Sequence, residues 1–211
     1  MSYSPLIVIA ILFFLHNFIA KVHLVKEPIL EPLLRRLRIR RILPIIARYP
    51  ACRLLDIGCG WEARFLREVE PHISKGVGID FKAPEIKTGK IETYRAVLAD
   101  RLPFPDHSFE VVTMLAVLEH LDNPVDVVKE ALRVLVPGGI FAGTVPSKAA
   151  KPVLEFLSYR LGIVNPDEIR DHKCYYDREL LVATLAEAGF DDVHHRYFQF
   201  GMNNFFVASQ T

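Results

Sequence analysis

Residues 53–60 carry the sequence RLLDIGCG, a short apolar run that ends in an aspartate and two glycines. The run predicts a buried strand, and the glycines predict a tight turn that leads into a helix over residues 62–70. In an open α/β sheet, ligands bind at the turn after the first strand, because glycine lets a ligand approach the backbone. This stretch therefore predicts both the class of fold and the position of its site.

The chain after residue 50 alternates strand and helix patterns. Further strands are expected at residues 76–80, 91–99, 109–117 and 140–145, helices at 124–135 and 177–188, and a hairpin at 193–200 and 205–208. We therefore predict one α/β domain over residues 51–211. Its sheet would be doubly wound and Rossmann-like, with seven strands that are mostly parallel and a C-terminal antiparallel hairpin.

The composition indicates a globular protein of ordinary size. The 211-residue chain is 51% hydrophobic and 24% charged, so it can bury a core and is not a disordered chain. Its three cysteines are scattered at Cys52, Cys59 and Cys174, without a CxxC pair. This argues against a disulfide framework and against a cysteine-built zinc site, and it indicates a reducing compartment.

The N-terminal segment is strongly apolar and is followed by positive charge. Residues 6–15 read LIVIAILFFL, and a helix over residues 3–22 would be roughly 30 Å long, close to the thickness of a bilayer core. We expect residues 1–26 to form a hydrophobic membrane anchor or interfacial helix, and residues 27–50 to form a basic amphipathic linker helix. The Lys and Arg residues follow the apolar run, which predicts that the domain lies at the cytoplasmic face of a membrane. The alternatives are two soluble helices that cover the domain or, less favoured, a nucleic-acid patch.

Acidic residues end three of the expected strands, at Asp56, Asp80 and Asp100. The spacing Gly58-x-Gly60-x-x-Ala63 also satisfies the dinucleotide fingerprint, so an NAD(P)-dependent oxidoreductase is an alternative. However, a carboxylate at Asp56 would repel a pyrophosphate, whereas it suits a cation such as an ammonium or a sulfonium. Asp80 follows Gly60 by twenty residues, where a carboxylate can accept both hydroxyls of a ribose. The three acids favour a positively charged nucleoside over a diphosphate.

Four stretches resemble consecutive motifs of class I S-adenosylmethionine-dependent methyltransferases, in order and at suitable spacings. They are LLDIGCG at 54–60, GVGID at 76–80, ADRLPFPDHSFEVVTMLAVLEHLDNP at 99–124 and ALRVLVPGG at 131–139. The likeness, to domains of the methyltransferase type 11 kind, covers about residues 51–146 well and the rest loosely. It implies that S-adenosylmethionine is the cofactor.

The resemblance also implies roles for single residues. Asp56 and the loop of Gly58, Cys59 and Gly60 would hold the methionine part of the cofactor. Asp80 would bind the ribose hydroxyls, with Phe81 beside the adenine. Asp100 would contact the adenine amino group, Arg101 would add a backbone contact, and Leu115 and Ala116 would close the pocket. The alternative for the acids is a role in helix capping or turns. Trp61 replaces a glycine common in the family, and we expect it to pack in the core rather than to lean over the cofactor.

Methyl transfer from a sulfonium needs alignment more than catalytic side chains, although an oxygen or nitrogen acceptor can require a base. The candidates are His120, in a Glu119-His120 pair after the fourth strand, and His172, which Asp171 would orient. A capping or structural role is the alternative for each histidine. Some related quinone-pathway enzymes bind a metal with an extra glutamate three residues before such a Glu-His pair. This chain has Ala116 at that position, so no metal site is expected.

These observations predict a methyltransferase that acts on a small-molecule, lipid or lipid-linked acceptor at the cytoplasmic membrane face. An NAD(P)-dependent oxidoreductase and a non-catalytic membrane-associated scaffold are the alternatives. No nucleic-acid partner is expected, and the sequence does not indicate an oligomeric state.

Overall fold

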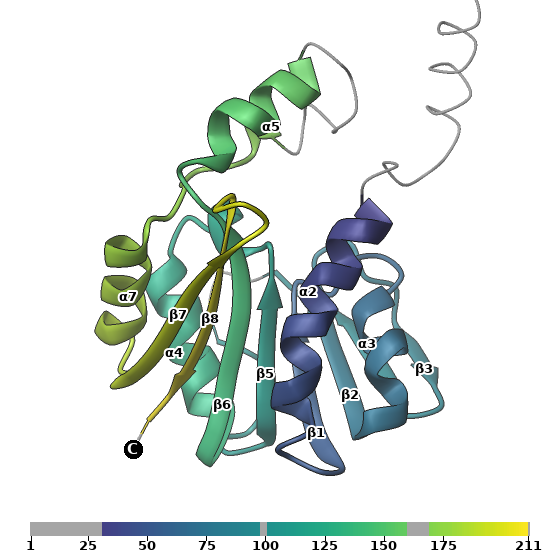
Figure 1. The fold of residues 1–211 in the computed structure, drawn as a ribbon. Helices are drawn as coiled ribbons and strands as arrows, with labels where there is room; N and C mark the ends of the chain where they lie inside the picture. The colour runs from purple at the N-terminus through teal and green to yellow at the C-terminus, as the bar shows by residue number, and fades with distance from the viewer. Residues whose placement is uncertain (1–30, 98–100, 160–168, 211) are drawn as a thin grey trace, which may run out of the picture.

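The computed structural model describes residues 31–97, 101–159 and 169–210, which form one eight-stranded sheet with helices on both faces (Figure 1). The strand order is β3-β4-β2-β1-β5-β6-β8-β7. Strands β4, β2, β1, β5 and β6 are parallel, whereas β8 runs antiparallel to both β6 and β7. The strands are β1 Cys52–Ile57, β2 Ile73–Asp80, β3 Ile86–Thr88, β4 Ile91–Arg95, β5 Phe109–Leu115, β6 Leu135–Pro146, β7 Asp192–Phe198 and β8 Asn203–Ser209. The predicted doubly wound α/β fold with a C-terminal hairpin is confirmed.

The sheet has eight strands rather than the predicted seven because of β3. This three-residue strand pairs antiparallel with β4 across a turn at Gly89 and Lys90, at the edge of the sheet. None of its side chains is buried. Strand β3 therefore has neither the apolar alternation nor the length that would predict a strand from the sequence.

Helices cover the two faces of the sheet in pairs. Helices α2 (Glu31–Ile46) and α3 (Arg64–Val69) lie on one face, and α4 (Pro124–Val134) and α7 (Arg178–Glu187) lie on the other (Figure 1). Helix α5 (Ala150–Tyr159) follows β6 at the carboxyl end of the sheet, and short 3-10 helices occupy Glu70–His72 (η1) and Leu118–His120 (η2). Neighbouring residues of β1 belong to opposite cores, with Leu54 on the α2 and α3 side and Leu55 on the other. Both faces of the parallel strands are therefore buried, as a doubly wound sheet requires.

Two of these helices differ from the sequence expectation. In α2, which lies within the predicted linker at residues 27–50, Ile42 and Ile46 are buried in the domain core, whereas Leu33 is exposed. The C-terminal half of the helix is therefore part of the domain. The helix predicted at residues 62–70 begins only at Arg64, because Ala63 has a left-handed backbone conformation (φ 46°).

Among the described residues, no helix combines the length and the apolar character needed to cross a bilayer. The predicted hydrophobic helix and anchor, residues 1–26 with the segment 3–22, lie outside the described residues.

Candidate functional site

The site lies where the strand order reverses. From β1 the chain builds outward to β2 and β4 on one side, and then returns to place β5 on the other side of β1. Ligands of open α/β sheets bind beyond the carboxyl ends of the strands at such a switch point. The residues that follow β1, β2 and β5 therefore form the candidate site.

The turn after β1 needs its glycines for different reasons. Gly58 has a φ of +80°, and a Cβ at this position would lie 2.2 Å from Cγ2 of Val117, so any larger residue would clash with the segment after β5. Gly60 also has a positive φ (+70°), but a Cβ there would meet nothing within 4 Å. Gly58 thus allows the segments after β1 and β5 to pack closely, whereas Gly60 leaves its backbone accessible from open space.

The amide groups of this turn are already bonded within the protein. The N–H groups of Gly58 and Cys59 donate to the carbonyl of Ile79 at 2.8 and 3.1 Å, and the N–H of Gly60 donates to Oδ2 of Asp80 at 3.1 Å. A pyrophosphate would need such amides as donors. The geometry therefore does not favour the dinucleotide alternative.

Asp80, at the end of β2, is held by backbone on both oxygens. Its Oδ2 accepts from Gly60, and its Oδ1 accepts from the N–H of Lys82 at 2.7 Å. A carboxylate has about four acceptor positions, so two acceptor positions of this fixed group are free for a ligand. Two vicinal ribose hydroxyls match that capacity.

Asp56, at the end of β1, is 2% exposed. Its Oδ1 accepts a hydrogen bond from the hydroxyl of Thr113 at 2.7 Å. Burial raises the pKa of Asp56 from 3.8 to about 7; the Thr113 hydrogen bond opposes this shift, and the negative charge of Asp80 adds to it. A carboxyl group in this state favours a cation as its neighbour, because a positive charge would stabilise the ionised form.

The other predicted cofactor residues are placed as follows. The Phe81 ring follows Asp80, is 55% exposed and lies 4.7 Å from the ammonium of Lys82. Ala116 follows β5 with a φ of 57°, and its N–H donates to the carbonyl of Thr144 at 2.8 Å. Asp100 lies outside the described residues. The expectation for Trp61 is wrong, since the indole is 64% exposed beside the glycine turn instead of packing in the core.

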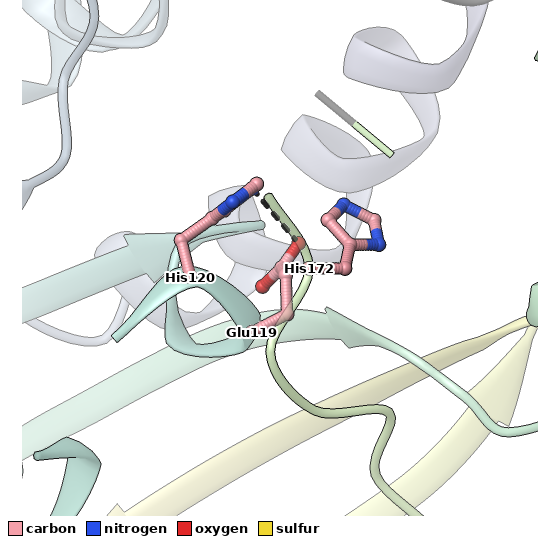
Figure 2. A group of neighbouring side chains, drawn as sticks. All are labelled: Glu119, His120 and His172. Carbon is pink, nitrogen blue, oxygen red and sulfur yellow. Dashed lines mark ion pairs between the residues drawn. The ribbon is translucent and has the colours of Figure 1, made fainter. Parts of the chain in front are cut away.

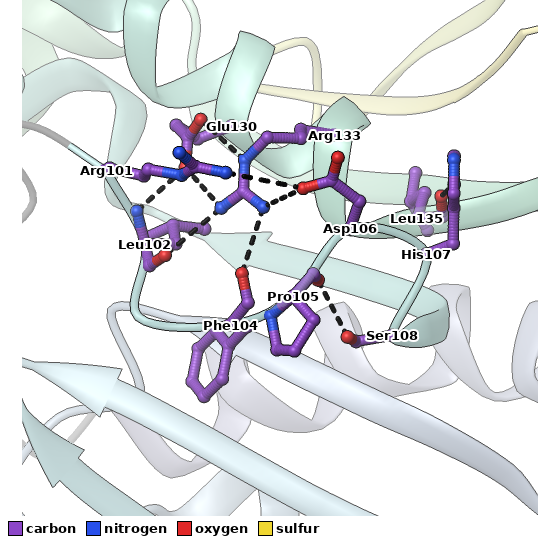
Figure 3. Close-up of polar contacts among 10 residues, drawn as sticks. All are labelled: Arg101, Leu102, Phe104, Pro105, Asp106, His107, Ser108, Glu130, Arg133 and Leu135. Atoms are coloured by element: carbon purple, nitrogen blue, oxygen red, sulfur yellow. Dashed lines mark hydrogen bonds and ion pairs between the residues drawn. The ribbon is translucent and has the colours of Figure 1, made fainter.

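The segment after Asp100 is fixed by one arginine of helix α4 (Figure 3). The guanidinium of Arg133 donates to the carbonyls of Leu102 and Phe104, at 3.1 and 2.9 Å, and to the carboxylate of Asp106. The side chain of Arg101 is largely exposed, with its guanidinium 3.6 Å from the same Asp106 carboxylate. This network holds the backbone that borders the predicted adenine side of the site.

The two predicted catalytic histidines lie together. His120 belongs to η2 after β5, and His172 lies in the segment before α7, with 4.8 Å between the ring centroids (Figure 2). The backbone joins the two segments, because the N–H of Lys173 donates to the carbonyl of Glu119 at 2.8 Å. Residues far apart in the sequence thus form one cluster, on the segment that follows Val117 and on the segment before α7.

The hydrogen-bond partners within this cluster differ from the expectation. Oδ2 of Asp171 lies 3.0 Å from Nδ1 of His120, whereas the expected partner of Asp171 was His172. Nδ1 of His172 instead lies 2.9 Å from the hydroxyl of Tyr175. Burial lowers the pKa of His172 to about 4; the charge of His120 also lowers it, and the charge of Asp171 opposes the shift.

Glu119 is the member of the cluster to which the sequence analysis gave no role. Its side chain is 1% exposed, and Oε2 has no hydrogen-bond partner among the described residues. Oε1 lies 4.0 Å from Nε2 of His120 (Figure 2). Burial raises the pKa of Glu119 to about 8. The sequence signal for this residue was its place in the Glu119-His120 pair after the fourth predicted strand.

Comparisons with known proteins agree with this architecture. The family model described as a methyltransferase domain matches residues 55–143, which include Asp56, the glycine turn, Asp80 and the Glu119-His120 pair. The 27-O-demethylrifamycin SV methyltransferase of Amycolatopsis mediterranei is 33% identical over 154 residues, 64% of this chain and 56% of that protein, so the chain spans little more than half of this relative's length. The demethylmenaquinone methyltransferase of Lactiplantibacillus plantarum is 26% identical over 178 residues, 70% of this chain and 74% of that protein.

A solved structure shares the fold. It is that of an S-adenosylmethionine-dependent methyltransferase from Thermotoga maritima, with a TM-score of 0.62 at 17% identity, over 92% of this chain and 95% of the other.

Proposed function

Because the chain belongs to the family of class I S-adenosylmethionine-dependent methyltransferases, we propose that it transfers the methyl group of S-adenosylmethionine to a small-molecule acceptor. The observation that carries this proposal is the pair of acids at adjacent strand ends, Asp56 and Asp80, beside a turn whose amides are bonded internally. The two relatives described above are named for small-molecule acceptors, demethylrifamycin and demethylmenaquinone.

Each end of the cofactor has a partner of suitable chemistry. The cationic methionine part would lie over the Gly58, Cys59 and Gly60 turn near the buried Asp56, where its charge is favourable. The ribose would bind the two free acceptor positions of Asp80, and the adenine would lie against the exposed Phe81 ring. The family motif gives Asp100, Arg101 and Ala116 the remaining contacts.

The chemistry requires little beyond this placement. The acceptor atom attacks the methyl carbon as the bond from carbon to sulfur breaks, which leaves neutral S-adenosylhomocysteine, so the enzyme must align three atoms and exclude water. The acceptor also loses a proton when it is a hydroxyl or an amine. We assign that proton to the His120 and His172 cluster, in which His120 lies on the segment that packs against Gly58 through Val117.

Calorimetry with S-adenosylhomocysteine and with NADH tests the class of ligand. We expect binding of S-adenosylhomocysteine and a large loss of affinity in Asp80→Ala, with no response to NADH. The reverse pattern would favour the oxidoreductase. Transfer of labelled methyl groups from the cofactor into a whole-cell lipid and metabolite extract, followed by mass spectrometry, then identifies the acceptor. Cofactor binding without transfer into any fraction would favour the non-catalytic scaffold.

We further propose that the enzyme works at the cytoplasmic face of a membrane, on a lipid or lipid-linked acceptor. The apolar segment at residues 3–22 and the Lys and Arg residues that follow it support this proposal. Deletion of residues 1–26 should move the protein from the membrane fraction to the soluble fraction while leaving affinity for S-adenosylhomocysteine unchanged. Identical fractionation of the two forms would contradict the anchor.

A further inference from the structure

Glu119, His120 and His172 form a compact group of side chains that have the chemistry of metal ligands. One ligand atom of each lies within 4.8 Å of the others (Figure 2). We propose that these three residues bind a divalent transition-metal ion at the acceptor side of the site. The placement of the acceptor rests on the proposed function, whereas the ion site does not.

The hydrogen bonds of the two imidazoles leave the same nitrogen available on each ring. Nδ1 of His120 is engaged by Asp171 at 3.0 Å, and Nδ1 of His172 is engaged by Tyr175 at 2.9 Å. Metal-binding histidines commonly donate one ring N–H to such an oxygen, which fixes the tautomer and leaves the other nitrogen with its lone pair for the ion. Nε2 of both rings is thus available as a ligand.

The third ligand provides independent support. Oε2 of Glu119 is buried and accepts no hydrogen bond from the described residues. Such an oxygen carries an uncompensated cost of desolvation unless something binds it. The charge of Arg38 in α2 acts on Glu119, but this side chain donates no hydrogen bond to Oε2. A cation held by both oxygens of the Glu119 carboxylate, between it and the histidines, would satisfy the orphaned Oε2.

The ligand set indicates the class of ion. Two imidazoles and one carboxylate suit zinc and its first-row neighbours, whereas magnesium and calcium prefer oxygen ligands. Ligand atoms around a four-coordinate zinc ion lie roughly 3.4 Å apart, given bonds of about 2.1 Å. Glu119 Oε1 and His120 Nε2 are 4.0 Å apart, and the three ligand atoms lie within 4.8 Å of one another, so side-chain movements of roughly 1.4 Å or less close the site. The backbone bond from Lys173 to Glu119 keeps the two ligand-bearing segments together.

Three protein ligands leave coordination positions open, as in catalytic metal sites. With both imidazoles as ligands, the ion would take over the role that a histidine base has without it: an acceptor hydroxyl bound there would have a lowered pKa, release its proton to water and attack the methyl group as an oxyanion. No metal site was expected from the sequence, because Ala116 stands where some related enzymes have a glutamate. In the structure His172 arrives from a distant segment and provides the third ligand instead.

The test uses the full-length protein, stripped with a chelator and titrated with zinc and with magnesium by calorimetry. We expect one zinc equivalent bound at micromolar affinity or tighter, and no response to magnesium. The variants Glu119→Gln and His172→Ala should each weaken zinc binding at least tenfold. The matched control is His194→Gln, which removes an exposed imidazole of β7 and should leave zinc affinity unchanged.

Affinity for S-adenosylhomocysteine, measured on the same samples, reports on folding and on the proposed function separately. All variants should retain it. Cobalt substituted for zinc should give the visible absorption of a site with nitrogen and oxygen ligands, and His172→Ala should abolish that spectrum. No zinc binding by protein that binds S-adenosylhomocysteine would overturn the proposal. Zinc binding that neither variant weakens would overturn it as well.

Discussion

The replacement Asp56→Asn separates the stability of the free protein from its affinity for the cofactor. Burial raises the pKa of Asp56 from 3.8 to about 7, so the folded protein holds a proton on this group that the unfolded chain releases near pH 4. Stability therefore falls as the pH rises from about 4 to 7, and the loss is complete above the folded pKa. A difference of about three pH units corresponds to roughly 4 kcal/mol at most.

Asparagine removes this cost while keeping the shape of the side chain. Its amide oxygen can still accept the Thr113 hydroxyl, which now lies 2.7 Å from Oδ1. Without ligand at pH 8.5, the free energy of unfolding should therefore increase by roughly 2–4 kcal/mol. At pH 5.5 only about half of the cost is present, so the gain should be about 2 kcal/mol smaller. Denaturant unfolding at the two pH values measures the difference.

The same variant should bind S-adenosylmethionine more weakly, by roughly tenfold to a hundredfold, because the cation loses its buried counter-charge. Stability and affinity thus move in opposite directions. Thr113→Val is the matched control, since loss of its hydrogen bond should raise the Asp56 pKa further and destabilise the protein most at pH 8.5. A gain in stability that is equal at both pH values would refute the electrostatic reasoning. Unchanged cofactor affinity would show that Asp56 does not face the cofactor.

Three further substitutions test other parts of the site. Asp80→Ala should weaken cofactor binding by a few kcal/mol, roughly a hundredfold or more in Kd by calorimetry, because the ribose hydroxyls and the Gly60 amide lose their acceptor. Gly58→Ala should lower the free energy of unfolding by roughly 2–3 kcal/mol in urea, because of the positive φ and because the new methyl group would clash with Val117. The second substitution Val117→Ala should recover the part of this loss that comes from the clash, and not the part that comes from the positive φ. Arg133→Met should lower the free energy of unfolding by roughly 2–3 kcal/mol in the same assay, because the carbonyls of Leu102 and Phe104 lose their donor. It should also weaken cofactor binding, because the backbone on the predicted adenine side would be less firmly held. Full retention of stability would contradict the network drawn in Figure 3.

The sheet and the cofactor side of the site could be predicted because their signals are local. A buried strand, a glycine turn and a terminal aspartate occupy eight consecutive residues, and the topology of parallel strands brings the ends of β1 and β2 to one edge. Asp56 and Asp80 therefore lie where the sequence placed them. Features with weak local signals were missed, such as the exposed strand β3 and the packing of Ile42 and Ile46 of α2 on the sheet.

The histidine cluster could not be predicted because it depends on a long-range contact. Sequence adjacency suggested that Asp171 would orient His172, but the segment turns so that Asp171 faces His120, 51 residues away. The expectation of no metal site, which rested on Ala116, considered only neighbours along the chain, whereas the structure brings His172 to Glu119 and His120 from another segment. The prediction for Trp61 was wrong for a similar reason, because the local sequence does not distinguish an indole that packs in the core from one that is exposed beside the glycine turn.

Asp56 and Glu119, the two least exposed acids of the site, lack a compensating hydrogen-bonded cation in the part of the chain that the structure describes. Asp56 bonds only to a neutral hydroxyl, and Glu119 keeps one oxygen without any hydrogen bond. Asp56 lies near the end of β1 and Glu119 lies just after the adjacent strand β5, on the two sides of the contact between Gly58 and Val117. A fold that held these charges only for its own stability would gain by replacing them with neutral residues. Their burial is instead explained if each meets a cation from outside, a sulfonium at one and a metal ion at the other. Each ligand should then stabilise the folded chain by an amount that grows with its concentration relative to its Kd.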